Sequence, residues 1–130
     1  MNPLEWVILI VEDEFDSLQT ISKILEHHGI QIRAAHNGNE CLRLLAEIEP
    51  TAVVMDLAMP EMDGWETLAE IRANPATAHL PVVAVTAFYS TDVGEDVFKA
   101  GFDGYFTKPV RPATFVNQLG QVIEACKAAR

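Results

Sequence analysis

The chain has 130 residues, of which 49% are hydrophobic and 22% charged, as expected for one globular domain that folds without a disulfide or structural metal. Its formal net charge of −10 disfavours nucleic acid and anionic membranes as direct partners. The acidity is uneven, because residues 1–87 hold 14 acidic and 4 basic side chains, whereas residues 88–130 hold 5 of each. The neutral final third therefore offers a surface for a protein partner. No signal peptide or membrane span is apparent, and we expect a cytoplasmic protein.

Apolar runs of strand length alternate with helical periodicity through the first half of the chain. A strand is predicted over residues 7–11, and the helix after it carries its apolar face on residues 18, 21, 24, 25 and 28. A second strand at 30–35 leads into a helix that ends before Pro50. The run at 52–56 predicts a third strand, and the next helix stops before Asn74 and Pro75.

The second half of the chain continues the same alternation. Pro81 opens a strand over 81–86, and Asp92 with Glu95 resembles a capping box for a helix that Gly101 ends. A short strand at 104–107 precedes a last helix, with Pro112 in its first turn. Cys41 and Cys126 fall on apolar helix faces, which predicts small core residues.

Five strand–helix units predict an α/β fold with a doubly wound parallel sheet and helices on both faces. Right-handed crossovers leave few topologies, and a flavodoxin-like (βα)5 sheet with strand order 2-1-3-4-5 places the first and third strands side by side. No repeat, linker or low-complexity stretch interrupts the pattern. We therefore expect one domain over residues 1–130.

Charged and hydroxyl side chains stand at the ends of four predicted strands. Glu12 and Asp13 follow the first strand, Asp56 ends the third, Thr86 ends the fourth and Lys108 follows the fifth. Ligands of open parallel sheets bind outside the carboxyl ends of the strands, so we expect these groups to converge. Three converging carboxylates repel one another unless one is protonated or a cation sits among them.

Mg²⁺ suits such a site because it prefers oxygen ligands and keeps several waters. Asp13 and Asp56 can bind it directly, Glu12 directly or through water, and a main-chain carbonyl near Ala58 can complete the protein's share. Mn²⁺ is the alternative cation.

Lys108 and Thr86 add a positive charge and a hydroxyl donor to the carboxylates and the metal. Together these groups form an electrostatic cradle for a phosphoryl group, since phosphoryl transfer depends mainly on positioning and charge neutralisation. Asp56 can then act as the nucleophile and form an aspartyl phosphate. Each residue taken singly has an ordinary structural interpretation, and the hypothesis depends on their occurrence at one edge of the sheet.

The chain resembles the receiver domain of two-component response regulators over about residues 6–125. Within that family it is similar to the chemotaxis regulators. The matching segments are residues 11–14, 53–64, 85–87 and 104–109. The resemblance implies that Asp56 accepts phosphate from a histidine kinase or a histidine phosphotransfer protein. It implies that Glu12, Asp13, Asp56 and the Ala58 carbonyl bind Mg²⁺, and that Thr86 and Lys108 contact the phosphate.

The resemblance also implies a cis bond at Lys108–Pro109, and a switch. As the resemblance implies, phosphorylation would draw Thr86 towards the phosphate, Tyr105 could then turn inward, and the surface of the fourth helix, fifth strand and fifth helix would shift. That surface would control a downstream partner or an output domain. The resemblance further implies that Ala58 and Phe88 flank the attacking water and tune the lifetime of the phosphate, and Phe88 offers no group to orient water.

Three other functions remain to be weighed. A haloacid-dehalogenase-type phosphatase would want a second aspartate where Ala58 stands. A flavodoxin would need a hydroxyl-rich and glycine-rich phosphate loop where Glu12 and Asp13 stand. A receiver-like interaction module would lack a site residue. The chain is either a stand-alone regulator or a fragment of a longer regulator or hybrid kinase, and Met1 favours an N-terminal receiver.

Overall fold

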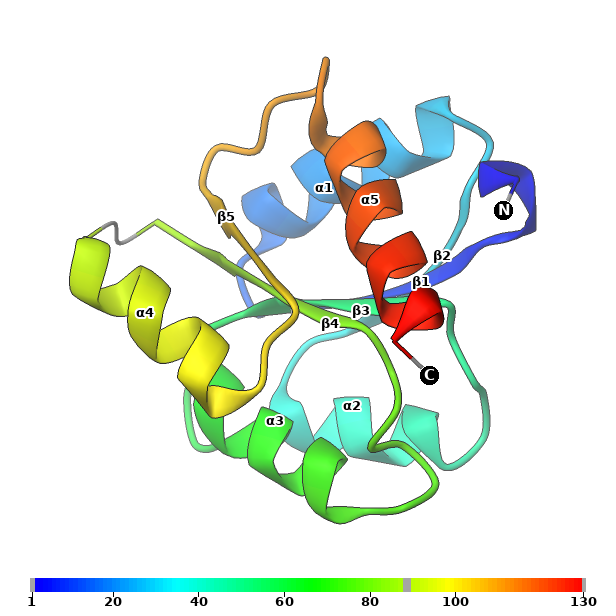
Figure 1. Ribbon diagram of the computed structural model, residues 1–130. Helices are drawn as coiled ribbons and strands as arrows, with labels where there is room; N and C mark the ends of the chain where they lie inside the picture. Colours follow the sequence, from blue (N-terminus) through cyan, green and yellow to red (C-terminus); the bar gives the residue numbers. More distant parts are fainter. Residues whose placement is uncertain (1, 88–89, 130) are drawn as a thin grey trace.

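The sheet of the protein has the predicted order. The computed structural model describes residues 2–87 and 90–129. Parallel strands are arranged β2-β1-β3-β4-β5, which confirms the flavodoxin-like prediction (Figure 1). The strands are β1 (Val7–Val11), β2 (Gln31–Ala35), β3 (Ala52–Asp56), β4 (Val82–Thr86) and β5 (Gly104–Thr107).

Helices cover both faces of this sheet, as predicted. They are α1 (Phe15–His27), α2 (Gly38–Leu45), α3 (Gly64–Ala73), α4 (Thr91–Ala100) and α5 (Phe115–Ala128), and a short 3-10 helix, η1 (Pro3–Glu5), precedes β1. Helices α1 and α5 lie on one face, and α2, α3 and α4 lie on the other (Figure 1).

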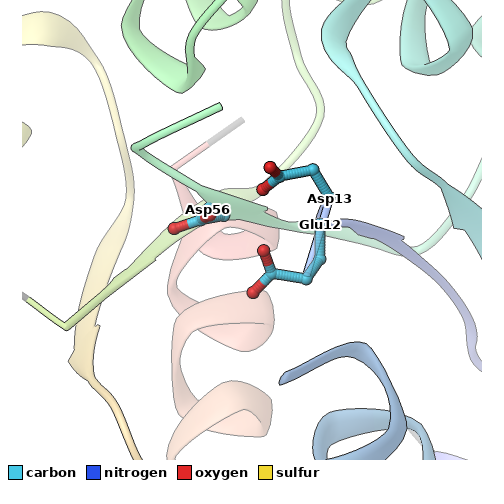
Figure 2. Close-up of side chains that lie close together, drawn as sticks. All are labelled: Glu12, Asp13 and Asp56. Atoms are coloured by element: carbon cyan, nitrogen blue, oxygen red, sulfur yellow. The ribbon is translucent and has the colours of Figure 1, made fainter. Parts of the chain in front are cut away.

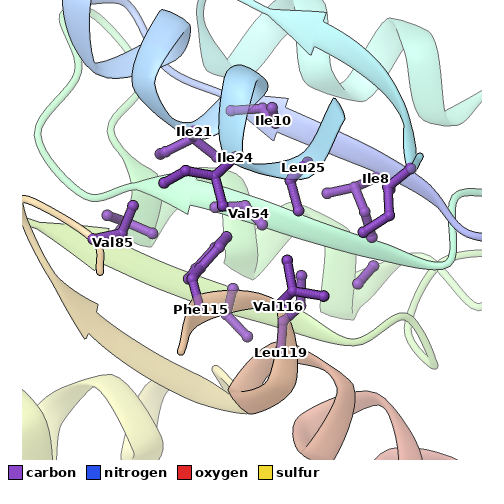
Figure 3. Close-up of a cluster of buried hydrophobic side chains, with 14 of the residues drawn as sticks. Ile8, Ile10, Ile21, Ile24, Leu25, Val54, Val85, Phe115, Val116 and Leu119 are labelled. Atoms are coloured by element: carbon purple, nitrogen blue, oxygen red, sulfur yellow. The ribbon is translucent and has the colours of Figure 1, made fainter. Parts of the chain in front are cut away.

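The two faces enclose separate hydrophobic cores because successive residues of a strand point to opposite sides. Ile8 and Ile10 of β1 belong to the core under α1 and α5, which Figure 3 shows. Leu9 and Val11 belong to the core under α2, α3 and α4. The central strands β3 and β4 are buried along their whole length, as their continuous apolar runs predict. The sheet therefore holds its strand ends on a rigid support.

Helix boundaries differ from the prediction in three places, the first being α2, which ends at Leu45 and does not extend to Pro50. The capping box predicted for Asp92 and Glu95 is wrong, because α4 already begins at Thr91 and Ser90 is its N-cap. Asp92 instead lies in the first turn, where its charge complements the helix dipole. A capping box does occur at the start of α3, between Asp63 and Glu66.

The last helix also starts later than predicted. Pro112 lies in a turn before α5, and Thr114 is the N-cap. Gly101 ends α4 with a φ of 110°, the left-handed conformation predicted for it. Cys41 is fully buried and Cys126 is half-buried, so the core prediction is confirmed for Cys41 and only partly for Cys126.

Candidate functional site

The register of the sheet brings three acids together. Val11 of β1 lies opposite Met55 of β3, so Glu12 and Asp13, which follow β1, lie beside Asp56. One oxygen from each of the three carboxylates lies within 4.8 Å of the others. Figure 2 shows these three side chains gathered at the same end of the sheet. Reasoning from the strand ends thus identified residues that do meet in space.

The three acids differ in burial. Glu12 is 1% exposed and Asp56 is 7% exposed, whereas Asp13 is exposed at the mouth of the site. Lys108 is half-buried, and its Nζ lies 2.5 Å from Glu12 Oε1 and 3.4 Å from Asp56 Oδ1. Lys108 therefore forms ion pairs with two buried carboxylates.

Burial and these contacts change the pKa values of Glu12 and Lys108. Burial raises the pKa of Glu12, and hydrogen bonding and charge from Asp56 raise it further against the opposing effect of Lys108. Burial opposes the charge on Lys108, but the hydrogen bond to Glu12 and the charge of Asp56 outweigh it, so the pKa of Lys108 is raised. The lysine stays charged, and Glu12 retains a proton more readily than a solvated glutamate.

A divalent cation fits this donor set. Glu12, Asp13 and Asp56 offer hard oxygen ligands around one point, and Lys108 balances the charge of one carboxylate. A cation among the carboxylates removes the remaining repulsion. Two observations support cation binding here: the three carboxylates gather in Figure 2, and Glu12 and Asp56 are buried.

The loop after β3 is folded back against the end of that strand. The backbone N–H of Gly64 donates to the carbonyl of Leu57 at 3.0 Å. A Cβ atom on Gly64 would lie 2.4 Å from the carbonyl oxygen of Asp56, so only glycine allows this approach. Ala58, in the same loop, is exposed and lines a groove with Thr86. The start of α3 is thereby held against the end of β3.

The ends of β4 and β5 are held together beside the acids. Thr86, which is 4% exposed, ends β4, and its carbonyl accepts a hydrogen bond of 2.9 Å from the backbone N–H of Lys108. This bond fixes the origin of the lysine side chain relative to Thr86. The next peptide bond, Lys108–Pro109, is cis.

Tyr105 lies on β5 and is half-buried next to α4. A Cβ built on Gly94 of α4 would meet its ring at 3.6 Å, an ordinary contact distance. Phe88 lies outside the described residues.

The strand-end reasoning missed the residues at the start of α1. Glu14 and Asp16 line a groove of about 320 Å³ together with Lys108 and Pro109. Phe15, between the two acids, is 70% exposed. The signal in the sequence was a run of acids that continues past Asp13, broken by one aromatic residue.

Among residues 2–87 and 90–129, no helix has the length and apolar character needed to cross a membrane.

Known proteins match the chain over most of its length. An uncharacterized 14.6 kDa protein of Leptolyngbya boryana is 36% identical over 114 residues, covering 88% of this chain and 87% of that protein. The polar-differentiation response regulator DivK of Brucella anthropi is 30% identical, covering 86% of this chain and 91% of DivK. Longer proteins also match, and the chain spans 22% of the regulatory protein AtoC of Escherichia coli, at 35% identity.

A solved structure shares the fold. The receiver domain of the sensor histidine kinase PA1611 from Pseudomonas aeruginosa PAO1 was solved with a magnesium ion coordinated in its active site cleft. It is 28% identical to this chain with a TM-score of 0.83, and the match covers 92% of this chain and 98% of that one. The family model of the response regulator receiver domain matches residues 8–120. The chain therefore belongs to the response regulator receiver domain family of two-component signalling.

Proposed function

We propose that Asp56 accepts a phosphoryl group from a histidine kinase or a histidine phosphotransfer protein, and that the chain is a phosphorylation-dependent switch. The observation that carries this proposal is the position of Asp56, which is nearly buried, beside two further carboxylates and 3.4 Å from the ammonium group of Lys108. We take residues 1–130 as a single receiver domain with a core of about 6–125. Phosphorylation and dephosphorylation at Asp56 are self-catalysed, and no metabolic reaction is implied.

The transfer step uses groups that the fold already positions. An oxygen of the Asp56 carboxylate attacks phosphorus and forms a P–O bond, while the P–N bond to the donor imidazole breaks. The imidazole nitrogen keeps the electron pair and takes a proton from solvent. Lys108 neutralises charge on the phosphoryl oxygens, and Thr86 offers its hydroxyl to them. The charge of Lys108, sustained by its carboxylate partners, is therefore available for the reaction.

The metal ligands would be Glu12, Asp13, Asp56 and the main-chain carbonyl of Ala58. When bound there, Mg²⁺ or Mn²⁺ supplies positive charge that offsets the negative charge shared by the carboxylates and the phosphoryl group. Because Asp13 is exposed, the site is open to solvent on the side of Asp13.

Phosphorylation would then change a distant surface. The modification adds about −1.5 to −2 charges at neutral pH, next to Thr86. Movement of Thr86 toward the phosphate leaves room for Tyr105 to turn inward. The change biases an existing equilibrium of the surface formed by α4, β5 and α5, to which a downstream protein or output domain would bind. Ala58 and Phe88 present no side chain that orients water, so the native chain loses its phosphate more slowly than the variant Phe88→Glu.

The proposal is tested by intact-mass measurement of phosphorylation with phosphoramidate and Mg²⁺. The native chain gains one phosphoryl group and Asp56→Asn gains none, while Asp92→Asn, an exposed change on α4, is labelled like the native chain. Labelling that survives Asp56→Asn identifies a different acceptor. Sustained turnover of a phosphate ester would instead favour a phosphatase.

Metal binding has its own test. Saturation with Mg²⁺ at 100 times its dissociation constant stabilises the protein by about 2.7 kcal/mol, seen as a rise in melting temperature. Asp13→Asn reduces this effect without disturbing the core, because Asp13 is exposed. Glu70→Gln, an exposed change on α3, is the matched control. An equal shift for all three proteins contradicts the assignment of Asp13.

A further inference from the structure

Strand β2 forms one edge of the sheet, and no other strand of residues 2–87 and 90–129 lies on its outer side (Figure 1). The backbone N–H of Glu12 donates to the carbonyl of Ala35 at 3.0 Å, so the backbone of Ala35 faces β1. Successive residues of a strand direct their backbone groups to alternate sides, and those of Ile32 and Ala34 therefore face outward. This edge offers two N–H donors and two carbonyl acceptors to a further strand.

A groove of about 660 Å³ lies against this edge. Its apolar lining comes from Val7, Ile30, Ile32 and Ile48. Val7 begins β1, so the groove lies at the end of the sheet opposite Asp56, which ends the parallel strand β3. An unpaired strand edge is a template for another strand, and an adjoining groove can accept one of its side chains.

The groove lies where α2 does not cover the sheet. Helix α2 ends at Leu45, and Ile48, which follows it, is half-buried. On the face of β1 that α2 packs against, Leu9 and Val11 are fully buried, whereas Val7 is half-buried. Apolar surface is therefore left open beside the unpaired edge.

The charged residues that line this groove are Glu26, Glu49 and Arg33, and all three are exposed. Two acids thus outnumber one base, on a chain whose net charge is −10. The carboxylate of Glu49 is held in position, because its Oε1 lies 2.6 Å from Nε2 of His79. A segment that carries lysine or arginine is therefore attracted to the groove, and an acidic segment is repelled.

A second copy of this chain does not suit the edge. Antiparallel pairing of two β2 strands that joins the outward groups of Ile32 to those of Ala34 places the two Arg33 side chains directly opposite each other. Like charges in that position are destabilising, and the two acidic grooves repel each other as well. The charges therefore favour a different chain as the occupant.

We infer that the outer edge of β2 is a docking site for an extended basic segment of a partner protein, which adds to the sheet as a further strand. The segment pairs its backbone with Ile32 and Ala34, places an apolar side chain in the groove and brings lysine or arginine to Glu26 and Glu49. This docking does not depend on phosphorylation, because the edge of β2 is remote from Asp56 in the sheet. A partner held there stays bound in either state of the switch.

The first experiment adds a short synthetic peptide of alternating lysine and valine to the native chain and follows amide hydrogen exchange by NMR. When about nine-tenths of the chain is bound, exchange of the Ile32 and Ala34 amides slows about tenfold, because only the free chain exchanges them. A peptide of alternating glutamate and valine gives no such protection. Absence of binding by the lysine peptide, or binding that leaves both amides unprotected, overturns the inference.

The second experiment separates strand pairing from general charge attraction. N-methylation of alternate residues of the lysine peptide removes the N–H donors along one of its edges and leaves its charge unchanged. Of the two peptides methylated in opposite alternation, one binds like the parent and the other binds at least about tenfold more weakly. Equal affinities of the two methylated peptides mean that no strand is added.

The charges of the groove are tested with variants of the chain. Glu26→Gln/Glu49→Gln binds the lysine peptide about fivefold more weakly at low salt, because each exposed charge about 7 Å away contributes about twofold to threefold, and the difference shrinks at high salt. Glu70→Gln/Glu95→Gln has the same net charge but changes exposed acids of α3 and α4, and it stays within about twofold of the native chain. Equal affinities of these two double variants contradict the assignment of the groove.

The apolar lining is tested in the same way. Ile48→Ser weakens binding of the lysine peptide, whereas Leu4→Ser, which changes an exposed apolar residue outside the groove, leaves it unchanged. The same affinity for both variants shows that no side chain of the peptide enters the groove, and the inference then fails.

Discussion

Arg72 of α3 and Asp103, just before β5, form an ion pair with 2.9 Å between Nη2 and Oδ2, although they are 31 residues apart in sequence. The remaining donors of the guanidinium bond to the backbone carbonyls of Ala78, Leu80 and Gly101. Asp103 also accepts from the backbone N–H of Val82. One side chain thus joins α3, the segment before β4 and the C-terminal end of α4.

Replacement of Arg72 is expected to destabilise the protein strongly. Arg72→Ala leaves three carbonyls and Asp103 without this partner, and the free energy of unfolding falls by about 2–4 kcal/mol. Urea denaturation measures the change. Arg43→Ala, on an exposed position of α2, stays within about 0.5 kcal/mol of the native protein. A loss no greater than that of the Arg43 variant shows that the network contributes little.

The buried acid beside Asp56 predicts a pH dependence of stability in the absence of divalent metal. The pKa of Glu12 is raised above its usual 4.5, chiefly by burial, so the folded chain binds a proton there more readily than the unfolded chain. The resulting stability is complete below pH 4.5 and is lost as the pH rises through the folded pKa.

Glu12→Gln cannot titrate and removes this dependence. We expect the native protein to lose stability relative to Glu12→Gln as the pH rises from about 4.5 into the neutral range, because the native carboxyl then ionises beside Asp56. Unfolding free energies of both proteins in a chelating buffer test this. Parallel pH profiles mean that Glu12 is no harder to ionise in the fold than in the unfolded chain.

Two glycines form a matched pair for the packing around the site. Gly64→Ala places a Cβ 2.4 Å from the backbone oxygen of Asp56, and we expect a loss of about 1–3 kcal/mol with impaired phosphorylation. Gly94→Ala meets the ring of Tyr105 at an ordinary distance and removes a glycine from inside α4, so stability rises by about 0.5–1 kcal/mol. Thermal unfolding and phosphoramidate labelling separate the two, and similar behaviour contradicts the backbone geometry described for Gly64.

The two thiols are expected to differ in reactivity. Burial raises the pKa of Cys41 to about 12, so its thiolate is nearly absent at pH 8 and its sulfur is also inaccessible. Cys126 on α5 is half-buried. Ellman's reagent should therefore modify Cys126 first in the folded protein, and Cys41 only after addition of denaturant. Cys126→Ser is the control, and rapid reaction of this variant without denaturant disproves the burial of Cys41.

Much of the architecture and the acidic cluster could be predicted from the sequence because both depend on local patterns. Continuous apolar runs mark strands buried on both faces, and the residue after each run must then lie at one edge of a parallel sheet. Glu12, Asp13 and Asp56 meet for this reason. Their identification needed the strand order and no side-chain detail.

The features that escaped prediction depend on contacts between distant segments. Apart from Asp103, the partners of Arg72 are backbone carbonyls, which leave no trace in residue type. The cap of α4 was assigned to Asp92 because Asp and Glu at that spacing resemble a capping box, yet Ser90 competes for the same role and the helix begins earlier. The exposure of Phe15 also could not be read from an alternation of apolar and polar residues.

The two separate cores have a consequence for how α4 and α5 can move relative to each other. Helix α4 packs on one core through Val97, and α5 packs on the other through Phe115 and Leu119, with β5 at the edge between them. A change in α4 can therefore repack one layer while the opposite layer keeps its shape. A protein that binds across this edge would contact both α4 and α5. It would therefore respond to a shift of α4 relative to α5.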